Sequence, residues 1–92
     1  MSLILQPVAL RLPNTKAVRT VDFSPRGEQF VIGQAGDGHG AVNLTLWDTD
    51  PPQLVAEIER QPHTTILQAR FSPAGRFLVY VDSNQQQFSL WS

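Results

Sequence analysis

The chain has few residues that could do chemistry, and the strongest candidates are its two histidines, His39 and His63. Asp37 and His39 lie two positions apart in the glycine-rich run 36–40, and several copies of that run could hold a metal ion only if they converged at one point. We interpret the run as a surface turn. We interpret His63 as a histidine that hydrogen-bonds within a sheet, because it has no cysteine or carboxylate at a ligand spacing. The sequence therefore predicts no catalytic residue, no metal and no cofactor, and we expect the protein not to be an enzyme.

Composition and charge argue against several other functions. The run 36–40 is not a phosphate loop, because no helix follows it to offer its N-terminus. The 92 residues carry 7 Lys and Arg against 8 Asp and Glu, and the basic residues have no interleaved aromatic residues, so we expect no nucleic acid partner. The apolar stretch 3–5 lacks a basic flank and is too short to span a membrane. The lack of cysteine fits a cytoplasmic location.

Strands must position whatever site exists, because the apolar residues alternate in short runs between turns rich in Pro, Gly, Asn and Ser. In the strand 18–23, the apolar anchors are Val18, Val21 and Phe23. The connections are too short for parallel crossovers, so we expect antiparallel pairing throughout. The segment 48–52 is predicted to be a connection, because Pro51 and Pro52 cannot sit in a helix or a central strand. We predict an all-β fold with no helix and eight strands, at 3–12, 18–23, 30–32, 42–47, 54–59, 66–71, 77–81 and 88–91.

The strands belong to a unit that occurs twice. Phe-Ser-Pro-Arg-Gly at 23–27 recurs as Phe-Ser-Pro-Ala-Gly at 71–75, an offset of 48 residues. Each copy is followed by Leu-Trp, at 46–47 and again at 90–91, an offset of 44 residues. A period of roughly 40–45 residues that ends in Trp-Asp is typical of four-stranded propeller blades. Two such units cannot close a propeller by themselves.

The strand 77–81 gives a physical reason to expect partners. Its five consecutive apolar residues leave no side for solvent, so both faces should be covered. Two blades alone would leave their outer faces wet, and each large apolar side chain exposed there forfeits on the order of 1.5–3 kcal/mol. Several such losses approach the total stability of a small domain, which is about 5–15 kcal/mol. We therefore expect that the chain is not a stable monomer.

The repeat resembles the WD-repeat family of β-propellers over essentially the whole chain. The segment 17–27 looks like that family's innermost strand and turn, and 44–48 looks like its third strand with the Trp-Asp pair. The resemblance implies a two-blade propeller unit over 1–92, with an outer strand at 3–12, a first blade at 17–59 and a second blade at 66–91. The sequence departs from the family pattern where Gly-His usually precedes the innermost strand, so His63 is the one candidate for that role.

The resemblance also implies how the ring is completed. Repeats of this family begin with an outer strand, and this chain ends at the third strand of its second blade. The second blade therefore lacks its outer strand, while the outer strand at 3–12 has no blade of its own. We expect that segment of one subunit to complete the second blade of the next, head to tail, in a closed ring or a filament. Four copies with eight blades are favoured over three copies with six. The residues expected at this subunit joint are Leu5, Val8, Leu10, Leu12, Phe88, Leu90 and Trp91.

By the same resemblance, the expected function is a non-catalytic scaffold that assembles with itself head to tail, either as a platform that binds a peptide or protein on its loop face or as a bare assembly with no ligand. Two alternatives stay open. The chain could be a small subunit or an engineered fragment that completes a larger propeller with a different chain. It could also be an enzyme or ligand site that forms only at subunit junctions. The candidate binding residues on the loop face are Lys16, Arg19, Asp37, His39, His63, Leu67 and Asn84.

Overall fold

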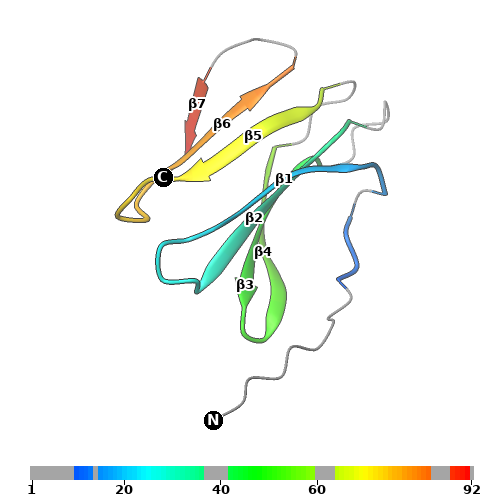
Figure 1. The fold of residues 1–92 in the computed structure, drawn as a ribbon. Coiled ribbons are helices and arrows are strands. Elements are labelled where there is room, and N and C mark those ends of the chain that lie inside the picture. The colour runs from blue at the N-terminus through cyan, green and yellow to red at the C-terminus, as the bar shows by residue number, and fades with distance from the viewer. Residues whose placement is uncertain (1–9, 14, 37–41, 60–63, 84–87, 92) are drawn as a thin grey trace.

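The chain folds into two antiparallel β-sheets that lie against each other, as the computed structural model shows in Figure 1. The structure describes residues 10–13, 15–36, 42–59, 64–83 and 88–91, and these contain seven strands and no helix. Sheet 1 has the order β1-β2-β3-β4 and sheet 2 has the order β5-β6-β7, so each sheet is a simple meander. No helix in the described part of the chain is long and apolar enough to cross a membrane. The strands are β1 (Val18–Phe23), β2 (Gln29–Gln34), β3 (Leu44–Thr49), β4 (Pro52–Glu59), β5 (Ile66–Phe71), β6 (Leu78–Asp82) and β7 (Phe88–Trp91).

The all-β prediction is confirmed, and the strands predicted at 18–23, 66–71 and 88–91 have the predicted bounds. The prediction that 48–52 is a connection was wrong at both ends. Asp48 pairs with Gln53 and Thr49 pairs with Pro52, so only two residues remain in the turn. Pro52 is tolerated because it is the first residue of β4, a strand at the edge of its sheet. The strand predicted at 3–12 falls largely outside the described residues, and its described part, 10–12, is not assigned to a strand and pairs with none of the seven described strands.

The two copies of the Phe-Ser-Pro motif form the same hairpin turn. In the first, the backbone N–H of Gln29 donates to Ser24 Oγ at 3.0 Å, and in the second the N–H of Phe77 donates to Ser72 Oγ at 3.1 Å. Gly27 and Gly75 both have φ of 74°, a left-handed conformation that glycine adopts without a steric penalty. The sequence repeat is therefore also a repeat of backbone geometry.

The register of the two hairpins repeats as well. Val18 pairs with Gln34 in the first hairpin, and Ile66 pairs with Asp82 in the second, 48 residues later in both strands. Each hairpin then shifts register at the next residue, which is Arg19 in β1 and Leu67 in β5. The residues of β1 and the residues 30–34 of β2 consequently have equivalents in β5 and β6 at a constant offset of 48, which allows the two hairpins to be compared position by position.

The sheets bury a core between them. β5 lies beside β1 and β2, which Figure 1 shows as the contact line from which the two sheets diverge. Gly33 permits the close approach, because a Cβ atom there would lie 2.5 Å from Ile66 Cγ2. The core residues are Val31, Leu44, Ile66, Ala69, Leu78 and Tyr80, with Ile58 and Phe71 partly buried around them.

The apolar run 77–81, which falls mostly in β6, is fully buried on one face alone by the described part of the chain. Leu78 and Tyr80 are buried in the core between the sheets. Val79 and Val81 are half-buried, and Phe77 is 42% exposed. Sheet 2 therefore has a second face that sheet 1 does not cover.

Candidate functional site: an uncovered sheet face and a polar cleft

Sheet 1 carries a row of aromatic side chains on the face that points away from sheet 2. Phe23 pairs across the strands with Phe30, and Phe30 pairs with Trp47, so the three share one face. The rings of Phe23 and Phe30 are 5.5 Å apart, and those of Phe30 and Trp47 are stacked at 6.1 Å. Val21 and Ile32 pair on the same side. We call this surface of sheet 1 the aromatic face.

The chain covers one half of the aromatic face and leaves the other half open. Phe30, Ile32 and Trp47 are buried, and Leu10 and Leu12 pack against them. On β1 at the end of the row, however, Val21 is 47% exposed and Phe23 is 58% exposed. Val18 of the same strand is 46% exposed. Neighbouring apolar side chains exposed along one strand mark an interaction surface more often than isolated ones do.

The buried polar group nearest this face is satisfied within the sheet. The indole Nε1–H of Trp47 donates to Thr45 Oγ1 at 2.9 Å. Trp47 is 4% exposed and Thr45 is fully buried, so the pair leaves no indole donor toward a ligand. Trp47 is therefore a structural residue of sheet 1.

The line where the sheets meet uses side chains to satisfy a strand edge. β5 is an edge strand, and its amide groups at Ala69 and Phe71 point toward sheet 1. The N–H of Phe71 donates to Asp22 Oδ2 at 2.9 Å, and the N–H of Ala69 donates to Thr20 Oγ1 at 3.4 Å. Thr20 and Asp22 thus act as acceptors for a strand edge that would otherwise lack partners.

Arg70 completes this contact from the other side. Its Nη1 donates to the carbonyl oxygen of Ala69 at 2.9 Å and to Thr20 Oγ1 at 3.2 Å. The guanidinium therefore curls back over its own strand edge, and one side-chain hydroxyl joins the two sheets. The contact at this line is polar, while the contact behind it is the apolar core.

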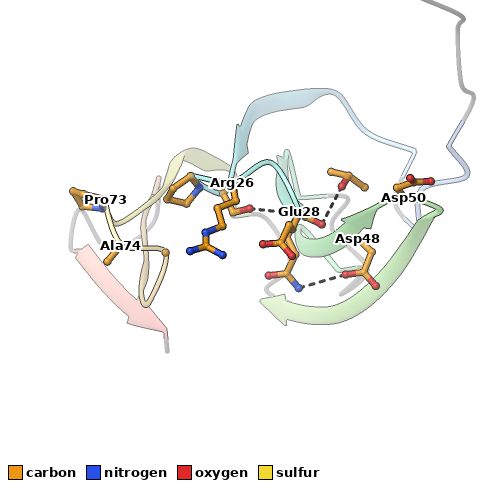
Figure 2. A pocket seen from close by; sticks show the side chains of 11 residues that line it. Arg26, Glu28, Asp48, Asp50, Pro73 and Ala74 are labelled. Atoms are coloured by element: carbon orange, nitrogen blue, oxygen red, sulfur yellow. Dashed lines mark hydrogen bonds between the residues drawn. The ribbon is translucent and has the colours of Figure 1, made fainter.

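A polar cleft of about 830 Å³ lies at the turn end of the sheets. Figure 2 shows Asp48 and Asp50 on one side of it, Pro73 and Ala74 on the other, and Arg26 with Glu28 between them. Three hairpin turns build the cleft: the turns after β1, β3 and β5. Asp48 accepts hydrogen bonds from Gln29 Nε2 at 3.5 Å and from Gln53 Nε2 at 3.3 Å.

The cleft has a weakly acidic lining. Glu28, Asp48 and Asp50 contribute carboxylates, and Arg26 contributes one cation. The hydroxyl of Thr49 donates to backbone carbonyl groups of the first turn at 2.8 Å and 3.0 Å, so it stabilises the turn. Within the described ranges, no group of three or more His, Cys, Asp or Glu residues could hold a metal ion.

The structure describes three of the residues predicted to bind on the loop face, and all three are exposed. Lys16 precedes β1, and its carbonyl oxygen accepts from Gln34 Nε2 at 2.9 Å. Arg19 and Leu67 occupy the register shifts of β1 and β5, at equivalent positions of the repeat. These residues lie at or near the starts of the strands, away from the turns that form the cleft. The other four, Asp37, His39, His63 and Asn84, lie outside the described residues.

The structure describes some of the predicted joint residues. Leu10 and Leu12 pack on the aromatic face. Phe88, Leu90 and Trp91 lie in β7, which is an edge strand of sheet 2 among the described residues. Leu5 and Val8 lie outside the described part of the chain.

Sequence reasoning missed Thr20, Asp22 and Arg70, which make the polar contact between the sheets. Their signal is visible in hindsight, because the repeat has Thr20 and Asp22 where the second copy has Gln68 and Arg70. These changes of side chain at fixed repeat positions distinguish β1, whose side chains accept hydrogen bonds, from β5, whose backbone N–H groups donate them.

The chain has no match among the models of protein families, and no curated protein matches it.

Proposed function

We propose that the protein is a non-catalytic assembly scaffold, in which the aromatic face of one copy packs on the open face of sheet 2 of the next copy. In this proposal the sheets are blades of a propeller that several copies complete, as the WD-repeat resemblance implies. The partner is a second copy of the same chain. The support comes from comparing equivalent positions of the two hairpins.

The single observation that carries the proposal is a difference in burial at equivalent positions. Ile66 in β5 is 0% exposed because it packs on sheet 1, while its equivalent in β1, Val18, is 46% exposed. Ala69 is likewise 0% exposed, and its equivalent Val21 is 47% exposed. The same strand geometry with apolar residues at the same positions is covered by a sheet in the second hairpin and by no described sheet in the first. A sheet placed on β1 as sheet 1 lies on β5 would cover these side chains.

The segment before β1 supports this arrangement. Ile58 in β4, the strand of sheet 1 that precedes sheet 2 along the chain, packs against the core beside sheet 2. The residue 48 positions earlier is Leu10, and it packs against the aromatic face in the corresponding way. The segment 10–12 therefore lies where the outer strand of a preceding sheet would lie. The other strands of that preceding sheet are the ones that a neighbouring copy would supply.

The open face of sheet 2 is a suitable partner. Val31, on the face of sheet 1 that covers sheet 2, is fully buried in the core, and its equivalent Val79 is only half-buried. Val81 beside it is also half-buried. The chain thus presents two apolar faces, the aromatic face of sheet 1 and the open face of sheet 2. In the repeat, the aromatic face corresponds to the face of sheet 2 that packs on sheet 1, and the open face corresponds to the face of sheet 1 that packs on sheet 2.

Such a contact is head to tail, so repetition gives a ring or a filament. Propellers have about 4–8 blades, and two sheets per chain reach that range with three or four copies. We favour four copies and eight blades. The outer strand of the last sheet in each copy would come from the segment before β1 of its neighbour, beside β7.

The experiment compares two single substitutions in the full chain. Val21→Asp places a charge at a position whose equivalent is fully buried at the internal contact. Leu67→Asp is the matched control, because Leu67 is 54% exposed even though it lies next to Ile66 at the internal contact between the sheets. We expect Val21→Asp to abolish assembly in sedimentation velocity, while Leu67→Asp assembles like the unmodified chain.

Equal assembly of the two variants would reject the aromatic face as the joint. If the unmodified chain is monomeric, the partner is instead a different chain. The protein would then be a small subunit or fragment that completes a larger propeller. Circular dichroism of both variants at low concentration checks that each is still folded.

A further inference from the structure

The contact between sheets inside the chain and the proposed contact between copies differ at one hydrogen-bonding position. Inside the chain, Asp22 Oδ2 accepts the N–H of Phe71 at 2.9 Å. At the contact between copies, the repeat places Arg70 where Asp22 stands, and Phe23 where Phe71 stands. A guanidinium has donors and no acceptor, so Arg70 cannot accept that N–H.

The backbone direction at β1 makes the missing acceptor relevant. The N–H of Ser24 bonds to the carbonyl oxygen of Gln29, and the N–H of Ser72 bonds to that of Phe77 in the second hairpin. Because bonded residues alternate along a strand, the amide groups of Val21 and Phe23 point away from β2. They are the counterparts of the Ala69 and Phe71 amide groups, which use Thr20 and Asp22.

The other amide keeps an acceptor. Gln68 takes the place of Thr20, and its side-chain carbonyl can accept the N–H of Val21 as Thr20 Oγ1 accepts that of Ala69. The contact between copies therefore retains one side-chain acceptor of the pair and lacks the charged one. Hydrogen bonds to a charged group are the stronger class, so their loss weakens a contact more than the loss of a neutral one.

We propose that Arg70 sets the strength of self-association, because it replaces the carboxylate that fixes the internal contact. This inference rests on the proposed assembly and specifies its joint. With a carboxylate acceptor at the internal contact and none at the contact between copies, the internal contact is the stronger one. The contact between copies is then reversible, so the assembly depends on protein concentration.

The test restores an acceptor at position 70. Arg70→Asp and Arg70→Asn each remove the guanidinium and add an oxygen acceptor, and Arg70→Ala removes the guanidinium alone. All three lose the same bonds to Thr20 and Ala69, so their differences report the acceptor. We expect the dissociation constant of the contact, measured by sedimentation over a concentration series, to be about tenfold lower for Arg70→Asp than for Arg70→Ala. Arg70→Asn should fall between them.

The outcomes separate this inference from the proposed function. If the unmodified chain assembles and all three variants have the same dissociation constant, the assembly stands and the role of Arg70 is rejected. If the chain and every variant stay monomeric at all concentrations, both proposals fail. Should Arg70→Asp fail to fold by circular dichroism, the comparison of Arg70→Asn with Arg70→Ala decides the question.

Discussion

The hairpins β1–β2 and β5–β6 have the same turn, the same register and the same register shift, yet their surroundings differ. The second packs on sheet 1, and its side chains Ile66 and Ala69 are fully buried. The first has no described sheet in that place, and Val18 and Val21 remain about half exposed. Two copies of one structural unit thus serve as an internal reference for each other, and the covered copy indicates what the uncovered copy lacks.

The largest expected effect comes from truncating equivalent residues. Ile66→Ala should lower the free energy of unfolding by about 2–5 kcal/mol, because Ile66 is fully buried between the sheets. Val18→Ala should change it by less than about 0.5 kcal/mol in dilute protein, because Val18 is already about half exposed. Urea denaturation at two protein concentrations measures both values. A clear cost of Val18→Ala at high protein concentration alone would indicate that assembly covers Val18. Equal costs of the two substitutions in dilute protein would contradict the difference in burial between the two hairpins.

A smaller effect is expected where the first hairpin has a glycine and the second has a β-branched residue. Gly33 corresponds to Val81, and a Cβ atom at Gly33 would lie 2.5 Å from Ile66 Cγ2 and 2.6 Å from Thr20 Cγ2. Gly33→Ala should therefore destabilise the fold by about 1–3 kcal/mol, because it forces the two sheets apart. Thermal unfolding measures the change, and an unaltered midpoint would contradict the close packing at Gly33.

The smallest effect tests the equivalence itself. Ser24→Ala and Ser72→Ala each remove one side-chain acceptor in the hairpin turn, where the hydrogen bonds are 3.0 Å and 3.1 Å long. Each substitution should cost about 1 kcal/mol, and the two costs should agree within a few tenths. Chemical denaturation of the two variants side by side provides the measurement. A large cost for one serine and none for the other would show that the turns are not interchangeable.

Much of the fold was predictable because the repeat constrains it. The motif at 23–27 and 71–75 fixed both turns, and alternation of apolar residues located β1 and β5. The two-residue turn after Thr49 was not predicted, since two consecutive prolines favour a longer connection unless the strand they begin lies at a sheet edge. Edge position is a property of the assembled sheet, so the local sequence does not reveal it.

The candidate site was predictable in part. Val21 and Phe23 were expected to be apolar anchors, and the exposure of both side chains appears only when the sheets are placed. The acceptor roles of Thr20 and Asp22 depend on which strand edge faces them, which also requires the tertiary structure. The polar cleft was missed because its lining comes from three turns that are distant in sequence. The prediction of partners from the exposed apolar faces stays a prediction.

The native mass of the full chain across a range of concentrations decides whether copies assemble. Assembly through the aromatic face predicts a concentration-dependent species of three or four copies, with four favoured, each copy contributing 10.2 kDa. A single 10.2 kDa particle at every concentration, folded and without association, would contradict it.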